Sequence, residues 1–259
     1  MTYLDDVARI LSESGSPHAV LPPTLLFNEG WMLRLVLDWC SRNRDAVPAL
    51  RFLPGSRWYS EALLPSQFFS DSRGDGVGEG YTHADAVIGH FRMRQGGRGD
   101  IEIARAGAQL VVVEAKMGSL LSAGTTNAKK YDQAARNVAC VVKLVGDSGR
   151  HPSQYARLGF FVLAPQQRLR EGAFAPLLDK AHIERTVRER AAAFRDARHE
   201  RWLQEVFAPT LAVMDVDALS WEDVLAAISA FDPGVGSELE GFYRRCLVHN
   251  PLTLGKAAV

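Results

Sequence analysis

The sequence lacks a net charge and long apolar runs. Lys and Arg total 30 of the 259 residues, and Asp and Glu also total 30. A strong basic excess would have indicated a nucleic-acid-binding protein, so any phosphate-binding surface here has to be local. No apolar run approaches the 18 residues of a transmembrane helix, and no signal peptide is recognisable. We therefore expect a soluble cytoplasmic protein with no membrane partner.

Cysteine and histidine motifs are also lacking. The three cysteines, Cys40, Cys140 and Cys246, lie far apart and form no C-x-x-C pair. Cys40 and Cys140 fall in apolar helical patterns, which is typical of buried thiols in a reducing compartment. No His-rich cluster has the spacing of zinc ligands, which disfavours a zinc hydrolase. Internal repeats and low-complexity tracts are absent, and 47% of the residues are hydrophobic, enough for one large core.

The most informative stretch is residues 100–116. Two β-like runs flank a turn at Ala106-Gly107, where glycine tolerates positive φ. A hairpin folded about that turn places Asp100 opposite position 113 or 114, beside Glu114. Lys116 lies two residues further along and shares the face of Glu114. Two neighbouring carboxylates repel each other unless a cation lies between them, and a divalent metal does this best.

Asp100, a spacer of 13 residues and Glu114-Ala115-Lys116 together resemble the motif of the PD-(D/E)XK nuclease superfamily, also called restriction-endonuclease-like. The resemblance covers about residues 20–165. It implies an α/β fold with an αβββαβ core, in which helices flank a central mixed sheet. It also implies that Asp100 and Glu114 bind Mg²⁺ (or Mn²⁺) and that Lys116 assists phosphodiester hydrolysis. Gly99 stands where the family name has proline.

Other acids compete for the metal. Asp85, in a predicted strand over Thr82–Phe91, is the alternative to Asp100. With a turn near Gly96-Gly97, however, Asp85 falls opposite Ala106-Gly107, so Asp100 is preferred. Glu61 is either a surface residue or a site residue.

Two further polar residues come from the same reasoning. Glu29, in the first turn of a predicted helix over Thr24–Arg44, is either a helix-dipole acid or the extra metal-binding acid that the resemblance implies. His83 contacts substrate or forms local hydrogen bonds.

A predicted helix over Asn127–Val145 follows the motif and carries polar residues on one face. The resemblance implies that such residues contact phosphate or the catalytic water. Gln133 is the first candidate for a catalytic role and Lys130 is a candidate for substrate binding, while a solvated helix face is the alternative. The apolar segment Leu158–Ala164 predicts a buried strand parallel to the strand that ends in Glu114.

We interpret the whole chain, 1–259, as a single nuclease-like domain with a mainly helical C-terminal extension over 166–259. The predictions for this extension are a long helix over Phe174–Phe207, a strand over Leu211–Val216, and helices over Val224–Phe231 and Glu238–His249.

The predicted function is a metal-dependent nuclease that hydrolyses phosphodiester bonds by a metal-activated water, with DNA as the expected polymer. A homodimer is compatible with this function, since many such nucleases cut two strands. The alternative is a catalytically silent nuclease-like fold that serves as a nucleic-acid- or protein-binding module.

Overall fold

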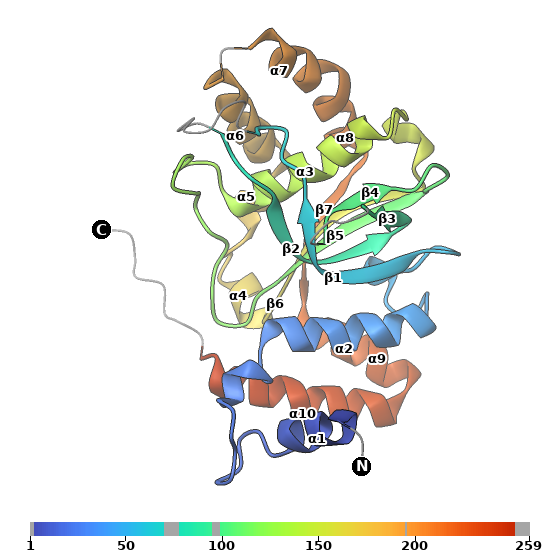
Figure 1. The fold of residues 1–259 in the computed structure, drawn as a ribbon, viewed down its shortest axis with the longest axis vertical. Helices are drawn as coiled ribbons and strands as arrows, with labels where there is room; N and C mark the ends of the chain where they lie inside the picture. Colours follow the sequence, from blue (N-terminus) through green and yellow to red (C-terminus); the bar gives the residue numbers. More distant parts are fainter. Residues whose placement is uncertain (1–2, 70–77, 95–98, 195, 252–259) are drawn as a thin grey trace.

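A computed structural model describes residues 3–69, 78–94, 99–194 and 196–251. Its centre is a five-stranded mixed sheet with helices on both faces (Figure 1), in the strand order β1-β2-β5-β6-β7. The strands are β1 (Arg57–Leu64), β2 (Thr82–Gly89), β5 (Gln109–Ala115), β6 (Arg157–Ala164) and β7 (Asp215–Ser220). β1, β2 and β5 are antiparallel, whereas β5, β6 and β7 are parallel. The predicted α/β class with a mixed central sheet is confirmed.

The helices form two layers (Figure 1). The first layer contains α3 (Gln133–Asp147), α5 (Ala175–Leu178), α6 (Lys180–Ala192), α7 (Ala197–Trp202), a π-helical segment (Leu203–Phe207) and α8 (Ala208–Val213). The second layer contains α2 (Glu29–Arg42), α9 (Trp221–Phe231) and α10 (Pro233–His249), with α1 (Tyr3–Ser12) beside α10. The short α4 (Gln166–Arg170) follows β6, and 3-10 turns occur at Pro23–Leu25, Pro48–Leu50 and Pro152–Gln154. In the part of the chain that the structure describes, we find no helix with the length and apolarity needed to cross a membrane.

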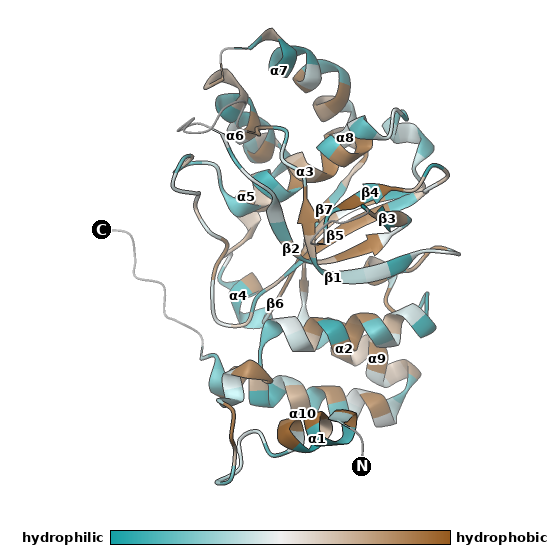
Figure 2. Ribbon diagram, in the orientation of Figure 1, coloured by the Kyte–Doolittle hydropathy of each residue, from teal (hydrophilic) through white to brown (hydrophobic). Residues whose placement is uncertain are grey.

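Both faces of the sheet are buried, and each has its own hydrophobic cluster. Leu110 and Val112 of β5 pack into the cluster under α3, whereas Val111 and Val113 pack into the cluster against α2 and α9. Every residue of β5 is buried, as expected for a strand covered on both sides. Figure 2 shows the hydrophobic colouring concentrated on these strands.

The crossover from β5 through α3 to β6 follows the prediction. β5 and β6 pair in parallel, with Val113 beside Phe161, so the predicted parallel strand is confirmed. The helix begins later than predicted, at Gln133, because Asp132 is its N-cap and accepts a hydrogen bond from the Ala135 N–H.

The predicted hairpin between residues 101–104 and 109–113 is wrong. The segment Ile101–Ile103 forms β4, which pairs with β3 (Phe91–Met93) in a separate two-stranded sheet. β5 pairs instead with β2, with Val87 opposite Val112. Asp100 forms an isolated bridge with Leu63, whose N–H donates to the Gly99 carbonyl on the edge of β1 that faces away from β2. The turn expected at Gly96-Gly97 lies outside the described residues.

β1 and β2 also change facing beside Asp85. In a regular strand, residues two apart face the same side, yet Ala84 packs into the α3-side cluster and Ala86 into the α2-side cluster. Glu61 lies across from Asp85, between the pairs Ser60–Ala86 and Ala62–Ala84. Among the described residues other than glycine, Glu61 alone has a positive φ, of 56°. The predicted register of Asp85 is wrong because it assumed that Thr82–Phe91 pairs with residues 101–104, whereas β2 pairs directly with β5.

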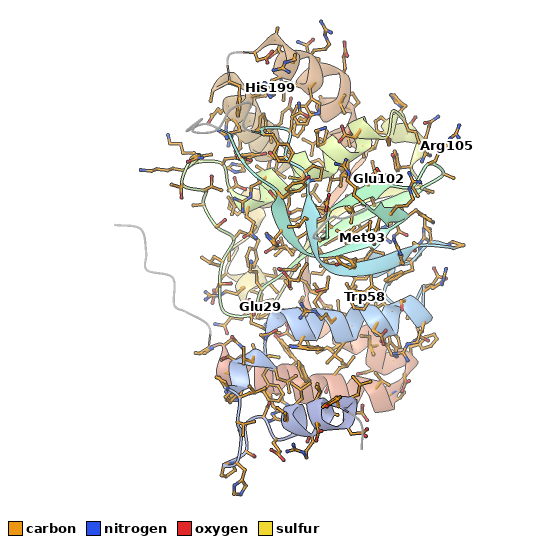
Figure 3. All side chains as sticks on the ribbon, viewed as in Figure 1. Glu29, Trp58, Met93, Glu102, Arg105 and His199 are labelled. Atoms are coloured by element: carbon orange, nitrogen blue, oxygen red, sulfur yellow. The ribbon has the colours of Figure 1, made fainter. Side chains whose placement is uncertain are left out.

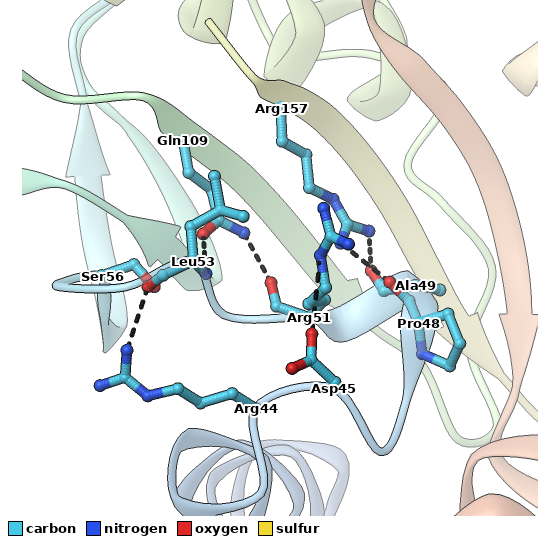
Figure 4. Close-up of polar contacts among 9 residues, drawn as sticks. All are labelled: Arg44, Asp45, Pro48, Ala49, Arg51, Leu53, Ser56, Gln109 and Arg157. Atoms are coloured by element: carbon cyan, nitrogen blue, oxygen red, sulfur yellow. Dashed lines mark hydrogen bonds and ion pairs between the residues drawn. The ribbon is translucent and has the colours of Figure 1, made fainter.

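The ends of β5 and β6 far from Glu114 are anchored to the segment that follows α2 (Figure 4). The buried Gln109 amide accepts a hydrogen bond from the Leu53 N–H at 2.8 Å and donates to the Arg51 carbonyl at 2.7 Å. Arg157 donates to the carbonyls of Pro48 and Ala49. These bonds satisfy backbone groups that would otherwise be unpaired and fix the starting positions of both strands.

The C-terminal third contributes more than helices, because β7 completes the central sheet beside β6. The strand predicted over Leu211–Val216 begins at Asp215, since residues 208–213 continue as α8. The single long helix predicted over 174–207 is several shorter helices. Ser220 caps α9 and accepts a hydrogen bond from the Asp223 N–H.

Candidate active site

Asp85 and Glu114 come together where the ladder between β2 and β5 ends. The last backbone pair of that ladder is Ala86 with Val113. Beyond it, Oδ2 of Asp85 accepts the Ala115 N–H at 2.8 Å, so the side chain replaces a backbone acceptor. Asp85 thus partners the acid of the E-x-K motif, where sequence reasoning had preferred Asp100.

Glu114 is only 2% exposed and points toward α3. Its Oε1 accepts hydrogen bonds from Nζ of Lys116 at 2.6 Å and from Nε2 of Gln133 at 2.5 Å. Its Oε2 has a long contact, 3.5 Å, with Nδ2 of Asn137. Lys116 and Gln133, two of the predicted site residues, therefore both contact Glu114.

Burial, together with repulsion from Asp85, raises the pKa of Glu114 to about 7, although Lys116 acts in the opposite direction. One ammonium group thus stands against two carboxylates. An additional cation would therefore reduce the repulsion between the two carboxylates.

Both Gln133 and Lys116 are held from more than one side. Oε1 of Gln133 accepts the Ser122 N–H at 3.1 Å, so both ends of its amide are engaged. The Lys116 N–H donates to the Leu163 carbonyl, and the Lys116 carbonyl accepts from Nε1 of the buried Trp221 at 2.9 Å. The C-terminal region thereby supports the backbone of the E-x-K motif.

A cavity of about 500 Å³ opens beside the two acids. Its walls come from β2 and the residues before it, from β5, from the loop after β5, and from α3. The lining residues are Gly78, Glu79, Gly80, Tyr81, Thr82, His83, Asp85, Glu114, Thr125, Thr126, Asn127, Gln133 and Arg136. Nδ2 of Asn127 donates to the Gly78 carbonyl at 3.0 Å, which joins two of these walls.

Of the remaining predicted site residues, some line this cavity and others lie outside it. His83 is exposed and lines the cavity. Lys130 lines an adjoining hollow of about 290 Å³, which shares Asn127 with the cavity. Asp100 is not among the lining residues, because its bridge to Leu63 places it on the opposite edge of β1.

Glu61 and Glu29 are not among the cavity residues either. Glu61 is 55% exposed and forms an ion pair with Arg34 of α2 at 3.0 Å. Glu29 begins α2, in the layer opposite α3 (Figure 3). Burial raises the pKa of the Cys246 thiol of α10, and Glu29 lies close enough to add to this shift.

Sequence reasoning missed three cavity residues. Glu79 has a side chain only 6% exposed, and burial raises its pKa. Its carboxylate accepts hydrogen bonds from Nε of Arg190 at 2.9 Å and from the Ser66 hydroxyl at 3.1 Å. Arg136 follows Gln133 by three residues, so helical spacing alone signals its position. No comparable signal marks Thr125.

The donor set suits a hard divalent cation. Within the described residues, no group of three His, Cys, Asp or Glu side chains forms a ready metal cage. Asp85 and Glu114 are two carboxylates in one cavity. Mg²⁺ is usually held by one or two carboxylates together with water and substrate phosphates, so the site fits this kind of binding.

Comparisons with known proteins identify no relative of this chain. The chain matches no family model, no curated protein and no solved structure.

Proposed function

We propose that this protein is a metal-dependent nuclease of the PD-(D/E)XK type that hydrolyses phosphodiester bonds, with DNA as its substrate. The observation that carries the proposal is the cluster of Asp85, Glu114 and Lys116 at one end of β2 and β5, beside an open cavity. Acids at the edge of a cavity, one with a raised pKa, mark a candidate functional site.

The order of elements also supports the proposal. α2, β1, β2, β5, α3 and β6 follow one another as the αβββαβ order of this superfamily requires, with the β3–β4 hairpin inserted before β5. The assignment differs from the sequence-based one in a single residue, because Asp85 takes the position that had been given to Asp100.

Each residue has a role that its contacts permit. Asp85 and Glu114 would hold Mg²⁺ or Mn²⁺, which when bound supplies positive charge against the charge that develops on the phosphate. Lys116 is placed to orient the attacking water near Glu114. Gln133 fixes the direction of the Glu114 carboxylate, and His83 stands at the cavity wall where substrate would enter.

The test is a cleavage assay with Mg²⁺, Mn²⁺ or EDTA on linear and circular DNA, single- and double-stranded, and on the matching RNAs. We expect metal-dependent cleavage of DNA that is lost in Glu114→Gln and in Lys116→Met. Asp100→Asn is the matched control, because it removes an acid outside the cavity. Cleavage that persists in Glu114→Gln and Lys116→Met would contradict the assignment.

A second candidate function is a nuclease-like fold that binds nucleic acid or protein without cutting. It is favoured by the absence of a third acidic ligand among the described residues at the site. Calorimetry with Mn²⁺ separates the two: binding that disappears in Asp85→Asn supports the enzyme, and no binding at millimolar Mn²⁺ leaves the binding module.

We place the activity in the cytoplasm, because all three cysteines are buried free thiols, as expected in a reducing compartment. A homodimer would allow both strands of a duplex to be cut. Light scattering of the purified protein, with and without DNA, measures the assembly directly.

A further inference from the structure

One lining residue of the cavity, Arg136, has a positively charged side chain that is paired with neither Asp85 nor Glu114. Arg136 lies on α3, three residues after Gln133, and lines the cavity. Within the described part of the chain its guanidinium forms no ion pair and donates no hydrogen bond, and its Nε is buried without a partner. Polar atoms in protein interiors are nearly always paired, so an unpaired guanidinium nitrogen at a cavity wall calls for an explanation.

A second unpaired polar atom lies in the same cavity wall. The hydroxyl oxygen of Thr125 is buried and has no hydrogen-bond partner among the described residues. Thr125 comes from the loop between β5 and α3, whereas Arg136 comes from the helix itself. Two elements that line one cavity thus each contain a buried polar atom without a partner.

The loop that carries Thr125 is tightly built. Thr125 and Ala128 exchange backbone hydrogen bonds, and Asn127 ties the loop to Gly78 across the cavity. At Gly124 an added Cβ would lie 2.4 Å from the Ala128 carbonyl oxygen, so only glycine allows the chain to pass this closely. The wall is therefore preformed, which reduces the entropic cost of binding a ligand.

The acids of the cavity do not neutralise Arg136. Glu79 is close enough for Arg136 to lower its pKa slightly, but the carboxylate is already bound by Arg190 and Ser66. Glu114 is bound by Lys116 and Gln133. The guanidinium is left as a positive group open to an anion.

We propose that Arg136 and Thr125 form a phosphate-binding subsite that holds the nucleic-acid strand next to the linkage that is cleaved at Asp85 and Glu114. This inference rests on the proposed function and adds a substrate-binding residue to it. A guanidinium can donate two parallel N–H bonds to phosphate oxygens, and the threonine hydroxyl can donate a third. A phosphate is favoured over other anions because the neighbouring acid pair would hold a metal that also binds phosphate.

The first test measures binding without cleavage. Fluorescence anisotropy of a short labelled single-stranded DNA, in EDTA, compares wild type with Arg136→Gln, Arg136→Lys and Thr125→Val. We expect Arg136→Gln to weaken binding by about tenfold or more, and Thr125→Val severalfold, as for charge-assisted and neutral hydrogen bonds respectively. Arg136→Lys should recover only part of the affinity, since lysine lacks the paired donors.

The matched control is Arg105→Gln. Arg105 (labelled in Figure 3) is exposed in the turn between β4 and β5 and is not among the residues that line the cavity, and its loss changes the net charge by the same amount. We expect a change below about twofold, within the range of a single screened surface charge. Equal losses in Arg105→Gln and Arg136→Gln would overturn the proposal.

A second test locates the contact on the DNA. Methylphosphonate groups, which remove one negative charge, are placed at each linkage in turn. In wild type, one substituted linkage should weaken binding more than the others, and in Arg136→Gln this extra loss should vanish. Identical profiles in the two proteins would overturn the subsite.

These outcomes separate the subsite from the nuclease function. Arg136-dependent DNA binding without cleavage under any metal rejects the nuclease and retains the subsite. Metal-dependent cleavage with a KM that Arg136→Gln leaves unchanged rejects the subsite and retains the nuclease. Melting temperatures of all variants show whether a loss reflects folding instead, and Arg136→Lys then serves as the informative variant.

Discussion

The end of the β2–β5 ladder and the start of β4 in the β3–β4 hairpin each contain an acid, Asp85 and Asp100 respectively. Asp85 is half-buried in the central sheet, with its carboxylate bonded to the backbone of β5. Asp100 precedes β4 and bridges to Leu63 on the outer edge of β1. The comparison shows that the number of residues between an acid and Glu114 does not decide which acid lies beside it. The acid beside Glu114 comes from the strand that pairs with β5.

The largest expected effect separates these two acids directly. Asp85→Asn removes one of the two carboxylates of the cavity and should lower metal-dependent cleavage by more than about a hundredfold, beyond the range typical of outer-sphere residues. Asp100→Asn should change activity by less than about threefold. Both are measured as kcat/KM at saturating Mg²⁺.

Mn²⁺ affinity by calorimetry provides the control for this pair, because it does not depend on turnover. Asp85→Asn should abolish the binding that Asp100→Asn retains. A larger loss in Asp100→Asn than in Asp85→Asn, in either measurement, would restore the hairpin register that the structure argues against.

Much of the fold is predictable from the sequence, because its signals are strong and local. The continuous apolar pattern of Leu158–Ala164 specifies a strand buried on both faces, and the structure places it beside β5. The amphipathic pattern after residue 127 specifies α3, although the cap at Asp132 was not recognised.

The partner of Glu114 is not predictable in the same way. Its position depends on a long-range choice, since β5 can pair with the segment immediately before it or with β2. The left-handed residue at Glu61 changes the facing of β1, and no sequence pattern announces it. Lys116 was predictable, because it follows Glu114 by two residues, and Gln133 was a candidate because it lies on the helix that follows the E-x-K strand. Arg136 and Thr125 matter only once the cavity is known.

The second prediction concerns pH and the metal-free protein. Glu114 has a pKa near 7 in the fold, above the 4.5 of an ordinary glutamate, so its contribution to stability is present below pH 4.5 and lost as pH rises through 7. A shift of this size corresponds to on the order of 3 kcal/mol, or a fall in Tm of roughly 6–12 °C. Thermal unfolding in EDTA between pH 5 and pH 8 measures it.

Glu114→Gln should remove most of this pH dependence, whereas Asp100→Asn should leave it unchanged. The variant is needed because burial also raises the pKa of Glu79, which acts in the same direction. Mn²⁺ should raise Tm more at pH 8 than at pH 5.5 in the wild type. A pH profile that Glu114→Gln does not flatten would place the titrating group elsewhere.

The third prediction compares the ion pairs of the two regions. Gln133→Ala leaves the Glu114–Lys116 pair without the amide that orients it, and kcat should fall by about 10- to 100-fold. Glu102→Ala breaks the exposed pair with Arg92 in the hairpin (Figure 3), and kcat should stay within about twofold. An equal effect of the two substitutions would show that the hairpin takes part in the site.

The smallest expected effect tests the residue that turns β1 between the two regions. Glu61 has φ of 56°, a conformation that costs an L-residue roughly 1–2 kcal/mol and glycine much less. Its exposed pair with Arg34 is worth under about 1 kcal/mol. Glu61→Gly should therefore be more stable to urea than Glu61→Ala by about 1 kcal/mol.

At Glu102 in the hairpin, the difference in stability between the glycine and the alanine variant should have the opposite sign. Glu102 lies in the regular strand β4, where glycine costs about 0.5–1 kcal/mol relative to alanine. Glu102→Gly should thus be less stable than Glu102→Ala by that amount. Because each glycine is compared with alanine at the same position, the loss of the ion pair cancels and only the backbone preference remains. If glycine destabilises both positions equally, the positive φ at Glu61 is not a source of backbone strain in β1.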